Sequence, residues 1–347
     1  MSSRPLLLVT SVALAACGRE APAIDPSATL LSATDTLVRP ADGEVAAPED
    51  LAVDTAGYIY LSDPGDHRVL VLDQQGTVLR SVGREGRGPG EMAAPRALSV
   101  AGDTLRVLDF GNDQVHVFTL PGLFVRSYGG LPGTSIAGVA FNASGAGVIA
   151  RHGLRNVLAL RFGPSGELGS SLGAPSTPPD LQYDFAAGKA DLAAGRIPPA
   201  LRNYSAPALA DDGSAWVLHI VDGTVDRYSS ADSLLWTATL PDSVLVRLRE
   251  GLFERTRRDT SPAGFYFPAV LLDGRTVGDT LWLLLQGGAN EPAEFALLSP
   301  SGAWLRPVRV TGATGIWRFA VDAPHHALYL LSKEEGTLLR AALPPMH

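Results

Sequence analysis

The sequence lacks the side chains and motifs that most often carry covalent or metal-dependent catalysis. Its 347 residues include one cysteine, so neither an intrachain disulfide nor a cluster of cysteine ligands can form. It contains no G-x-S-x-G elbow, no H-E-x-x-H helix signature and no P-loop. The sequence alone therefore predicts no particular reaction.

Aromatic residues and an excess of positive charge are also scarce. Aromatics make up 7% of the chain, and 28 Lys and Arg face 36 Asp and Glu, which leaves a net charge of −8. Binding to nucleic acid regardless of sequence depends on neutralising phosphates with Lys and Arg, so we expect no nucleic-acid partner. The 37 glycines and 26 prolines instead favour a fold with many strands and turns.

The first residues have the pattern of a targeting segment. Arg4 is followed by the apolar residues 6–13, a run too short to span a bilayer, and then by Leu14-Ala15-Ala16-Cys17. This sequence resembles the lipobox of bacterial lipoproteins, in which the cysteine becomes the lipidated first residue of the mature chain. We expect a signal peptide over residues 1–16, lipidation at Cys17 and a polar tether over residues 17–27. The resemblance implies membrane anchoring in the bacterial cell envelope, with the outer membrane favoured because glycine follows the cysteine.

Residues 48–90 contain four short apolar runs separated by turn residues. The runs begin at Leu51, Tyr58, Val69 and Thr77, and clusters of Gly, Pro and Asp lie between them. Runs of this length bounded by such residues predict antiparallel strands joined by tight turns. A meander of about 40 residues has the size of one propeller blade, which needs neighbouring copies to bury its faces.

A second copy follows in residues 95–128. Leu98 corresponds to Leu51 with a period of 47, and Asp109 corresponds to Asp63. Over Pro48–Gly90 and this second copy the chain resembles the NHL-like six-bladed β-propeller proteins. The blade signature of that family is matched by Asp66-His67-Arg68-Val69. The resemblance implies a propeller architecture and no particular activity.

The complete prediction is an all-β protein with a six-bladed β-propeller over residues 28–347. Four further blades follow, at about 136–172, 204–240, 265–310 and 315–344. The last of these has only three strands, so residues 28–39 are expected to supply its outer strand and close the ring.

Two insertions interrupt the repeats, at residues 173–203 and 241–264. Each contains a predicted helix, and in the second Asp242 or Ser243 is the expected cap, while Leu245, Leu248 and Leu252 share a face. Both connect the outer strand of one blade to the inner strand of the next. We therefore expect both on one face of the propeller, at one rim of the channel.

The candidate ligand site is a ring of polar residues that end the second strand of each blade. A strand end facing the channel mouth is where groups from different blades converge, although polarity is also ordinary where a strand becomes a loop. His152, adjacent to one of these positions, is a further candidate. The predicted ligand-binding residues are Asp63, Asp109, Arg151, His152, His219 and Gln286, with Ser332 or Lys333 at the same position in the last blade.

No metal site or cofactor is predicted. Asp63 and Asp109 could together hold Ca²⁺ or another divalent metal, but an Asp at a strand end more commonly accepts backbone N–H groups of the loop that follows. The starts of the inner strands form a poor set of metal ligands, comprising Glu49-Asp50, Arg96, Ile136, Ser205 and Arg318.

Three functions remain open on these observations, and one of them is a purely structural component of the envelope. The favoured one is a binding or scaffold module, monomeric and envelope-anchored, for a protein, peptide or glycan. The alternative is a metal-dependent hydrolase or lyase with its site at the channel mouth, since some propellers of this kind are lactonases or lyases. The absence of catalytic motifs favours a role that is not enzymatic.

Overall fold

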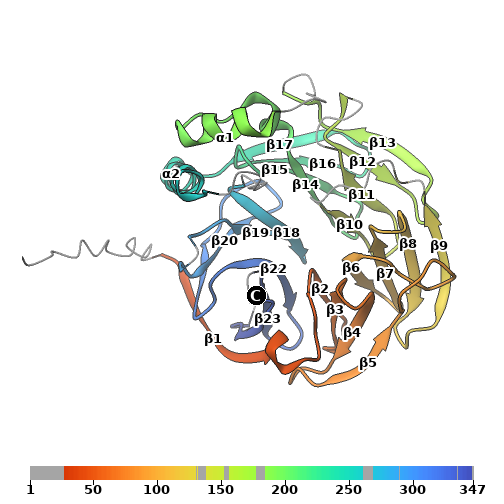
Figure 1. The fold of residues 1–347 in the computed structure, drawn as a ribbon. Coiled ribbons are helices and arrows are strands. Elements are labelled where there is room, and N and C mark those ends of the chain that lie inside the picture. The colour runs from red at the N-terminus through yellow and green to blue at the C-terminus, as the bar shows by residue number, and fades with distance from the viewer. Residues whose placement is uncertain are drawn as a thin grey trace, which may run out of the picture.

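The computed structural model describes residues 27–129, 131, 138–151, 156–176, 184–260, 269–288, 290–333 and 335–345. Antiparallel sheets surround a central channel (Figure 1), and their innermost strands face one another across it. The predicted signal peptide, Cys17 and His152 lie outside the described residues.

Four sheets have four strands each, paired in chain order as the meander pattern predicts. Their strands are β2 (Leu51–Val53), β3 (Ile59–Asp63), β4 (Arg68–Leu72) and β5 (Val78–Val82); β6 (Pro95–Ala101), β7 (Thr104–Asp109), β8 (Gln114–Thr119) and β9 (Phe124–Gly129); β10 (Val139–Phe141), β11 (Gly147–Ala150), β12 (Ala159–Phe162) and β13 (Leu168–Leu172); and β14 (Ser205–Leu209), β15 (Ala215–His219), β16 (Thr224–Tyr228) and β17 (Leu234–Thr239).

The remaining strands form one eight-stranded sheet, so the prediction of six separate blades is wrong. The order of its strands is β18-β19-β20-β21-β1-β24-β23-β22. Their bounds are β18 (Leu271–Val277), β19 (Thr280–Leu285), β20 (Ala293–Leu298), β21 (Val308–Thr311), β1 (Thr29–Val38), β24 (Leu338–Ala342), β23 (Ala327–Ser332) and β22 (Ile316–Asp322).

The strand β1 joins the two halves of this sheet because it is ten residues long and changes partner midway. Its first part pairs in parallel with β21, from Thr29 opposite Val308. From Ala33 onward it pairs antiparallel with β24. The expected pairing of the N-terminal strand with the last strands is present as the antiparallel pairing with β24. The parallel pairing with β21 was not expected, and it fuses two predicted blades into one sheet.

The hydrophobic core lies between adjacent sheets. The second and third strands of the first sheet are almost wholly buried, and Ile59, Tyr60 and Leu61 have no exposed surface. The outer strand β5 instead alternates between half-buried and exposed residues. This gradient is expected of sheets stacked radially, since inner strands are covered on both faces and outer strands on one.

Arginines on the outer half of the sheets connect each sheet to the next. Each donates to a backbone carbonyl in or beside the turn before the outer strand of the following sheet, a charge-assisted hydrogen bond stronger than a neutral one. The pairs are Arg80 with Leu120 at 2.9 Å, Arg126 with Pro164 at 2.6 Å, Arg161 with Ser229 at 3.0 Å, Arg227 with Pro300, and Arg340 with Gln74 at 3.5 Å.

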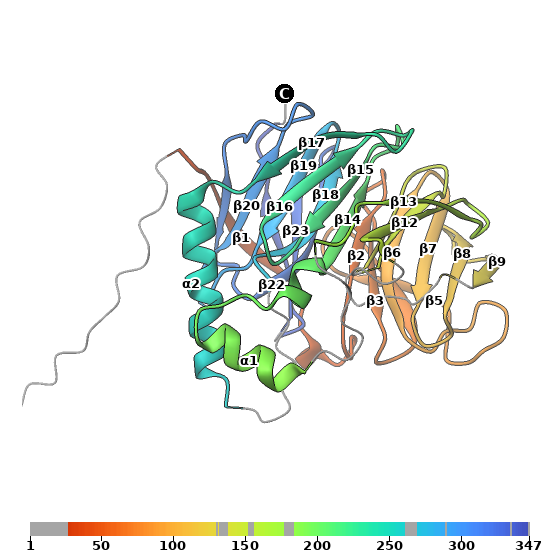
Figure 2. The same ribbon diagram turned by 90° about the horizontal axis from the view of Figure 1, so that it is seen from above.

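The two α-helices are α1 (Phe185–Ala193) and α2 (Asp242–Arg258), which contact each other, with short 3₁₀ turns at Pro40–Asp42 and Pro199–Asn203. Leu245, Leu248 and Leu252 of α2 are buried as predicted, whereas Pro241 stands at the N-cap and no side chain caps the helix. Neither helix lies at the channel mouth. Both lie at the periphery (Figures 1 and 2), because their leucines pack on the junction between β14–β17 and β18–β21. No helix among the described residues is long and apolar enough to cross a membrane.

Candidate ligand-binding site

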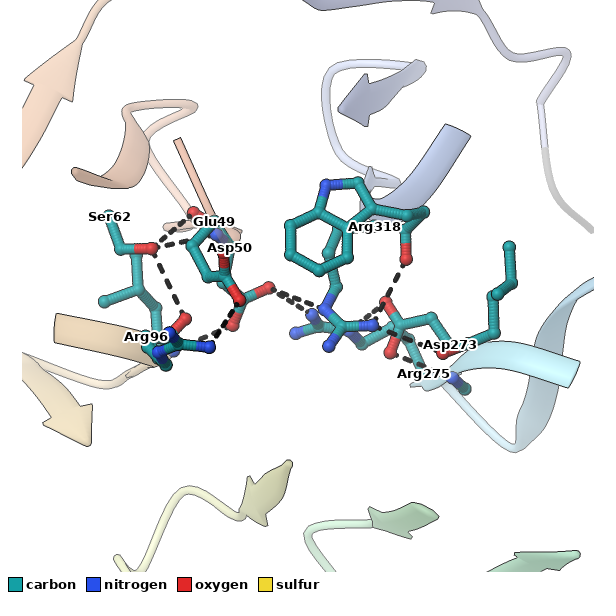
Figure 3. Close-up of polar contacts among 11 residues, drawn as sticks. Glu49, Asp50, Ser62, Arg96, Asp273, Arg275 and Arg318 are labelled. Atoms are coloured by element: carbon teal, nitrogen blue, oxygen red, sulfur yellow. Dashed lines mark hydrogen bonds and ion pairs between the residues drawn. The ribbon is translucent and has the colours of Figure 1, made fainter. Parts of the chain in front are cut away.

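The channel contains a cavity of about 250 Å³ lined by innermost strands. These are β2, β6, β10 and β14 of the four-stranded sheets and both edge strands, β18 and β22, of the eight-stranded sheet. Most of its walls are small or apolar. The charged side chains of the lining come from four of these strands or the residues just before them, and they are Glu49, Asp50, Arg96, Asp273, Arg275 and Arg318 (Figure 3).

Asp50 is the centre of this charged group. Its side chain is 5% exposed, its Oδ1 lies 2.6 Å from Nη2 of Arg275, and its Oδ2 accepts the backbone N–H of Leu98 at 2.8 Å. Strand β22 contacts both β2 and β18. The Asp50–Arg275 pair therefore bridges strands that are not neighbours and spans part of the channel (Figure 3).

Asp273 completes the inner layer of charges. Its Oδ2 lies 3.1 Å from Nε of Arg275, so two carboxylates share one guanidinium. Desolvation would lower the pKa of Arg275, but the charges of Asp273 and Asp50 raise it overall. Asp273 ends an irregularity in the β18–β19 pairing, between Leu271 and Asp273. From Asp273 onward the pairing is regular, so Asp273 and Arg275, two residues apart, lie on the same face of β18.

A second layer of charge lies at the start of the inner strands, around Glu49 and Arg96. Nη1 of Arg96 lies 3.3 Å from Oε1 of Glu49, and its guanidinium stacks 5.2 Å from the ring centre of Phe110. Burial raises the pKa of Glu49, and the positive charges of Arg96, Arg318 and Lys333 only partly oppose that rise.

Trp317 carries two further cations. The guanidinium of Arg318 lies 4.7 Å from the centre of its indole ring and the ammonium of Lys333 lies 5.1 Å from it, both within cation–π range. Arg318 follows an irregularity in the β22–β23 pairing, between Ile316 and Arg318, as Asp273 does in β18. The mouth of the channel is therefore polar and rich in hydrogen-bond donors.

Asp63 and Asp109, predicted as ligands, bind the protein's own backbone. Asp63 is fully buried, and its oxygens accept the N–H groups of Ala46 and Ala47 at 2.8–3.2 Å. Asp109 accepts those of Ala93 and Ala94 at 2.9 and 2.7 Å. Each carboxylate thus fastens the loop that enters the inner strand of its own sheet. This loop lies 15 to 17 residues before the Asp, whereas we expected bonds to the loop that follows. Among the described backbone N–H groups of the two following loops, only that of Gly111 donates, to Asp109 at 3.2 Å.

Asp109 has further partners in His116 and Asn112. The amide of Asn112 donates to Oδ2 at 2.7 Å, and Nε2 of His116 lies 3.4 Å from the same oxygen. Burial would raise the pKa of Asp109, but the hydrogen bonds from His116 and from the N–H groups of Ala94 and Ala93 lower it overall.

The remaining candidates from the sequence also lie outside the cavity lining. His219 lies 2.9 Å from Asp226, on the neighbouring strand of its own sheet. Gln286 donates to the carbonyl of Gly287 at 3.2 Å, and Arg151 is buried. His152 lies outside the described residues. These candidates occur at the correct ends of the strands but at too large a radius, because second strands are covered by the first. In the last sheet Ser332 is buried, whereas Lys333 is exposed and lies beside the indole of Trp317.

The structure shows no metal centre in the part of the chain it describes, where no three His, Cys, Asp or Glu residues lie close enough to hold an ion. The sequence presents Glu49-Asp50, Arg96 and Arg318 only as poor metal ligands and does not single out Asp273 and Arg275. All six residues lie at or near the start of an innermost strand, and this shared position is the feature by which the sequence could have identified them. Their mixed charge indicates an ion-pair network in place of a metal site.

Comparison with known proteins supports the fold and no activity. No protein-family model and no curated protein matches the chain. Among solved structures, the WD40 repeats of RRP9 align over 90% of this chain and 100% of theirs, with 11% identity and a TM-score of 0.56. A putative exported protein of Bacteroides fragilis aligns over 90% and 93%, with 9% identity and a TM-score of 0.51.

A third solved structure is regucalcin of Agrobacterium tumefaciens, described as a calcium-binding protein. It aligns over 91% of this chain and 96% of its own, with 10% identity and a TM-score of 0.51. At such low identity these similarities establish that the chain has a β-propeller fold and leave its function undetermined.

Proposed function

We propose that this protein is an envelope lipoprotein, anchored through Cys17, whose β-propeller binds a protein, peptide or glycan at the channel mouth. The single observation that supports this most directly is the composition of the mouth. Charged and aromatic side chains from several innermost strands converge around one cavity of about 250 Å³, which is the usual construction of a recognition site.

The centre of the channel favours binding over catalysis. A general acid or base needs a free proton-accepting group within reach of a substrate. Here the inner carboxylates Asp50 and Asp273 are both engaged by Arg275 at 2.6 and 3.1 Å. These ion pairs rigidify the floor of the cavity, so a ligand is expected to rest on the mouth.

The alternative is a metal-dependent hydrolase or lyase. Its support is the likeness to regucalcin, a protein described as binding calcium. Against it stands the lack of a metal-binding group within the described ranges. Metal analysis of the purified protein separates the two candidates, because only the enzyme hypothesis expects a stoichiometric ion.

Photo-crosslinking in intact cells tests the proposed function. Phe110 lines the cavity and is 37% exposed, so p-benzoylphenylalanine introduced there samples whatever occupies the mouth. The matched control is the same residue at Leu235, which is 51% exposed on the outer strand β17. We expect a discrete adduct from position 110 and none from position 235. Absence of an adduct at 110, or equal adducts at both positions, would refute binding at the mouth.

A further inference from the structure

Two cations beside the cavity share one aromatic ring, and within the described residues neither has an ion pair shorter than 4.0 Å. Arg318 and Lys333 lie 4.7 and 5.1 Å from the centre of the Trp317 indole. They come from different segments, because Arg318 is in β22 and Lys333 follows β23 directly. The strand pairing holds them together, with Ile316 opposite Ser332. Bringing two like charges to one ring is unfavourable unless an anion joins them.

The neighbouring carboxylates are already engaged by other groups. Asp50 lies 2.6 Å from Arg275 but 4.0 Å from Arg318, the outer limit of an ion pair. Glu49 pairs with Arg96 at 3.3 Å. Arg318 instead donates to the backbone carbonyls of Leu272 and Trp317, both at 3.2 Å. Among the described cations around the cavity, Arg318 and Lys333 are therefore held least tightly by carboxylates, although both also interact with the charge of Glu49.

Two buried hydrogen-bond donors at this place also lack an acceptor. Nε of Arg96 and Nε1 of Trp317 are buried, and neither has an acceptor in the described structure. A buried donor without a partner costs free energy, which an incoming acceptor can recover. The loosely held cations and these donors together indicate a ligand that brings anionic oxygens.

We propose that the channel mouth binds carboxylate side chains of an acidic peptide segment, with Arg318 and Lys333 as the binding cations. This inference rests on the proposed function and specifies its ligand. The planar guanidinium of Arg318 matches a carboxylate in two-point hydrogen bonding. A peptide fits better than a glycan, because Arg96 already covers Phe110 and two cations already occupy Trp317. Those rings are then not free to stack on sugars.

Fluorescence polarisation with a labelled pentaglutamate peptide tests the proposal on the purified full chain in detergent. The comparison peptide is pentaglutamine, and the comparison polymer is polygalacturonate. The test variant is Arg318→Gln with Lys333→Gln, and Lys333→Gln alone is a milder form because Lys333 is exposed. The matched control is Arg196→Gln with Arg258→Gln, which removes the same charge from side chains that are 67% and 78% exposed.

We expect pentaglutamate to bind and pentaglutamine to bind at least roughly tenfold more weakly, since charge-assisted bonds are about twice as strong as neutral ones. The double variant should lose about tenfold in affinity and the single variant less, with the control unchanged. Circular dichroism establishes that each variant is folded. Equal binding of the two peptides, preference for polygalacturonate, or an equal loss in the control overturns the proposal. If pentaglutamate fails to bind the wild type while position 110 still gives its adduct in cells, the proposed function stands and this assignment fails.

Discussion

Two pairs of aspartates in this propeller perform different tasks. Asp63 and Asp109 end second strands and accept backbone N–H groups 15 to 17 residues away along the chain. Asp50 and Asp273 lie at innermost strands, where Asp50 binds Arg275, 225 positions away, and Asp273 binds the same guanidinium from two positions away. The first pair organises loops within one sheet. The second pair closes the centre of the ring and sets the charge of the cavity.

The difference teaches where to look for function in such a fold. A carboxylate whose oxygens are saturated by backbone donors is fully used in folding, however well placed it looks in the sequence. The charges on innermost strands are the ones that a ligand meets, because only those strands line the channel.

Removing Asp109 should give the largest effect on stability. Asp109→Ala leaves the N–H groups of Ala93, Ala94 and Gly111 without their acceptor. Each shielded donor left without an acceptor costs about 1–3 kcal/mol, and water can replace part of the lost bonding. We therefore expect the free energy of unfolding to fall by about 3–4 kcal/mol. Urea denaturation measures this change. Asp109→Asn, which keeps one acceptor oxygen, should cost less, and equal losses in the two variants would contradict this account.

Removing Asp50 should destabilise the protein less but alter the mouth more. Asp50→Ala deprives Arg275 of its shorter ion pair, although Asp273 still binds it and the side chain of Arg275 is 28% exposed. Breaking a buried pair costs about 3–5 kcal/mol, so the partial compensation lowers our expectation to about 2 kcal/mol. Crosslinking from position 110 distinguishes the roles of the two aspartates. Asp50→Ala should change the yield of the adduct, and Asp109→Ala should leave that yield unchanged. The reverse pattern would refute the division of roles.

The pH dependence of unfolding should give the smallest of the three effects. The pKa of Asp109 is lowered in the folded state, despite burial, by its hydrogen bonds with His116 and the backbone. Its contribution is therefore present above the unfolded pKa of about 3.9 and is lost as pH falls through the folded pKa. Denaturation between about pH 5 and 3 should show the wild type and Asp109→Asn converging as pH falls. A constant difference would exclude this linkage.

Much of the architecture could be predicted from local patterns. The repeat of apolar runs and the turn residues between them predicted the four meanders close to their observed bounds. The strands β2–β5, for example, lie within the predicted range 48–90. The apolar spacing of Leu245, Leu248 and Leu252 predicted the buried face of α2. The number of sheets could not be predicted, because β1 has two possible partners and only the assembled ring offers both β21 and β24 to it.

The site was predicted less well than the fold. The tendency of Asp63 and Asp109 to bind nearby N–H groups follows from their short side chains and their position at a strand end. The charged mouth depends on which strands lie innermost and on bulges that re-aim Asp273 and Arg318.

The sequence by itself determined the repeated strands and the turns between them, because both depend on residues close together along the chain. The tertiary structure alone decided that β1 fuses two groups of strands and that Asp50 meets Arg275. Ion pairs across a channel depend on distances that exist only once the ring has closed. Neither hydrophobic periodicity nor turn chemistry contains that information.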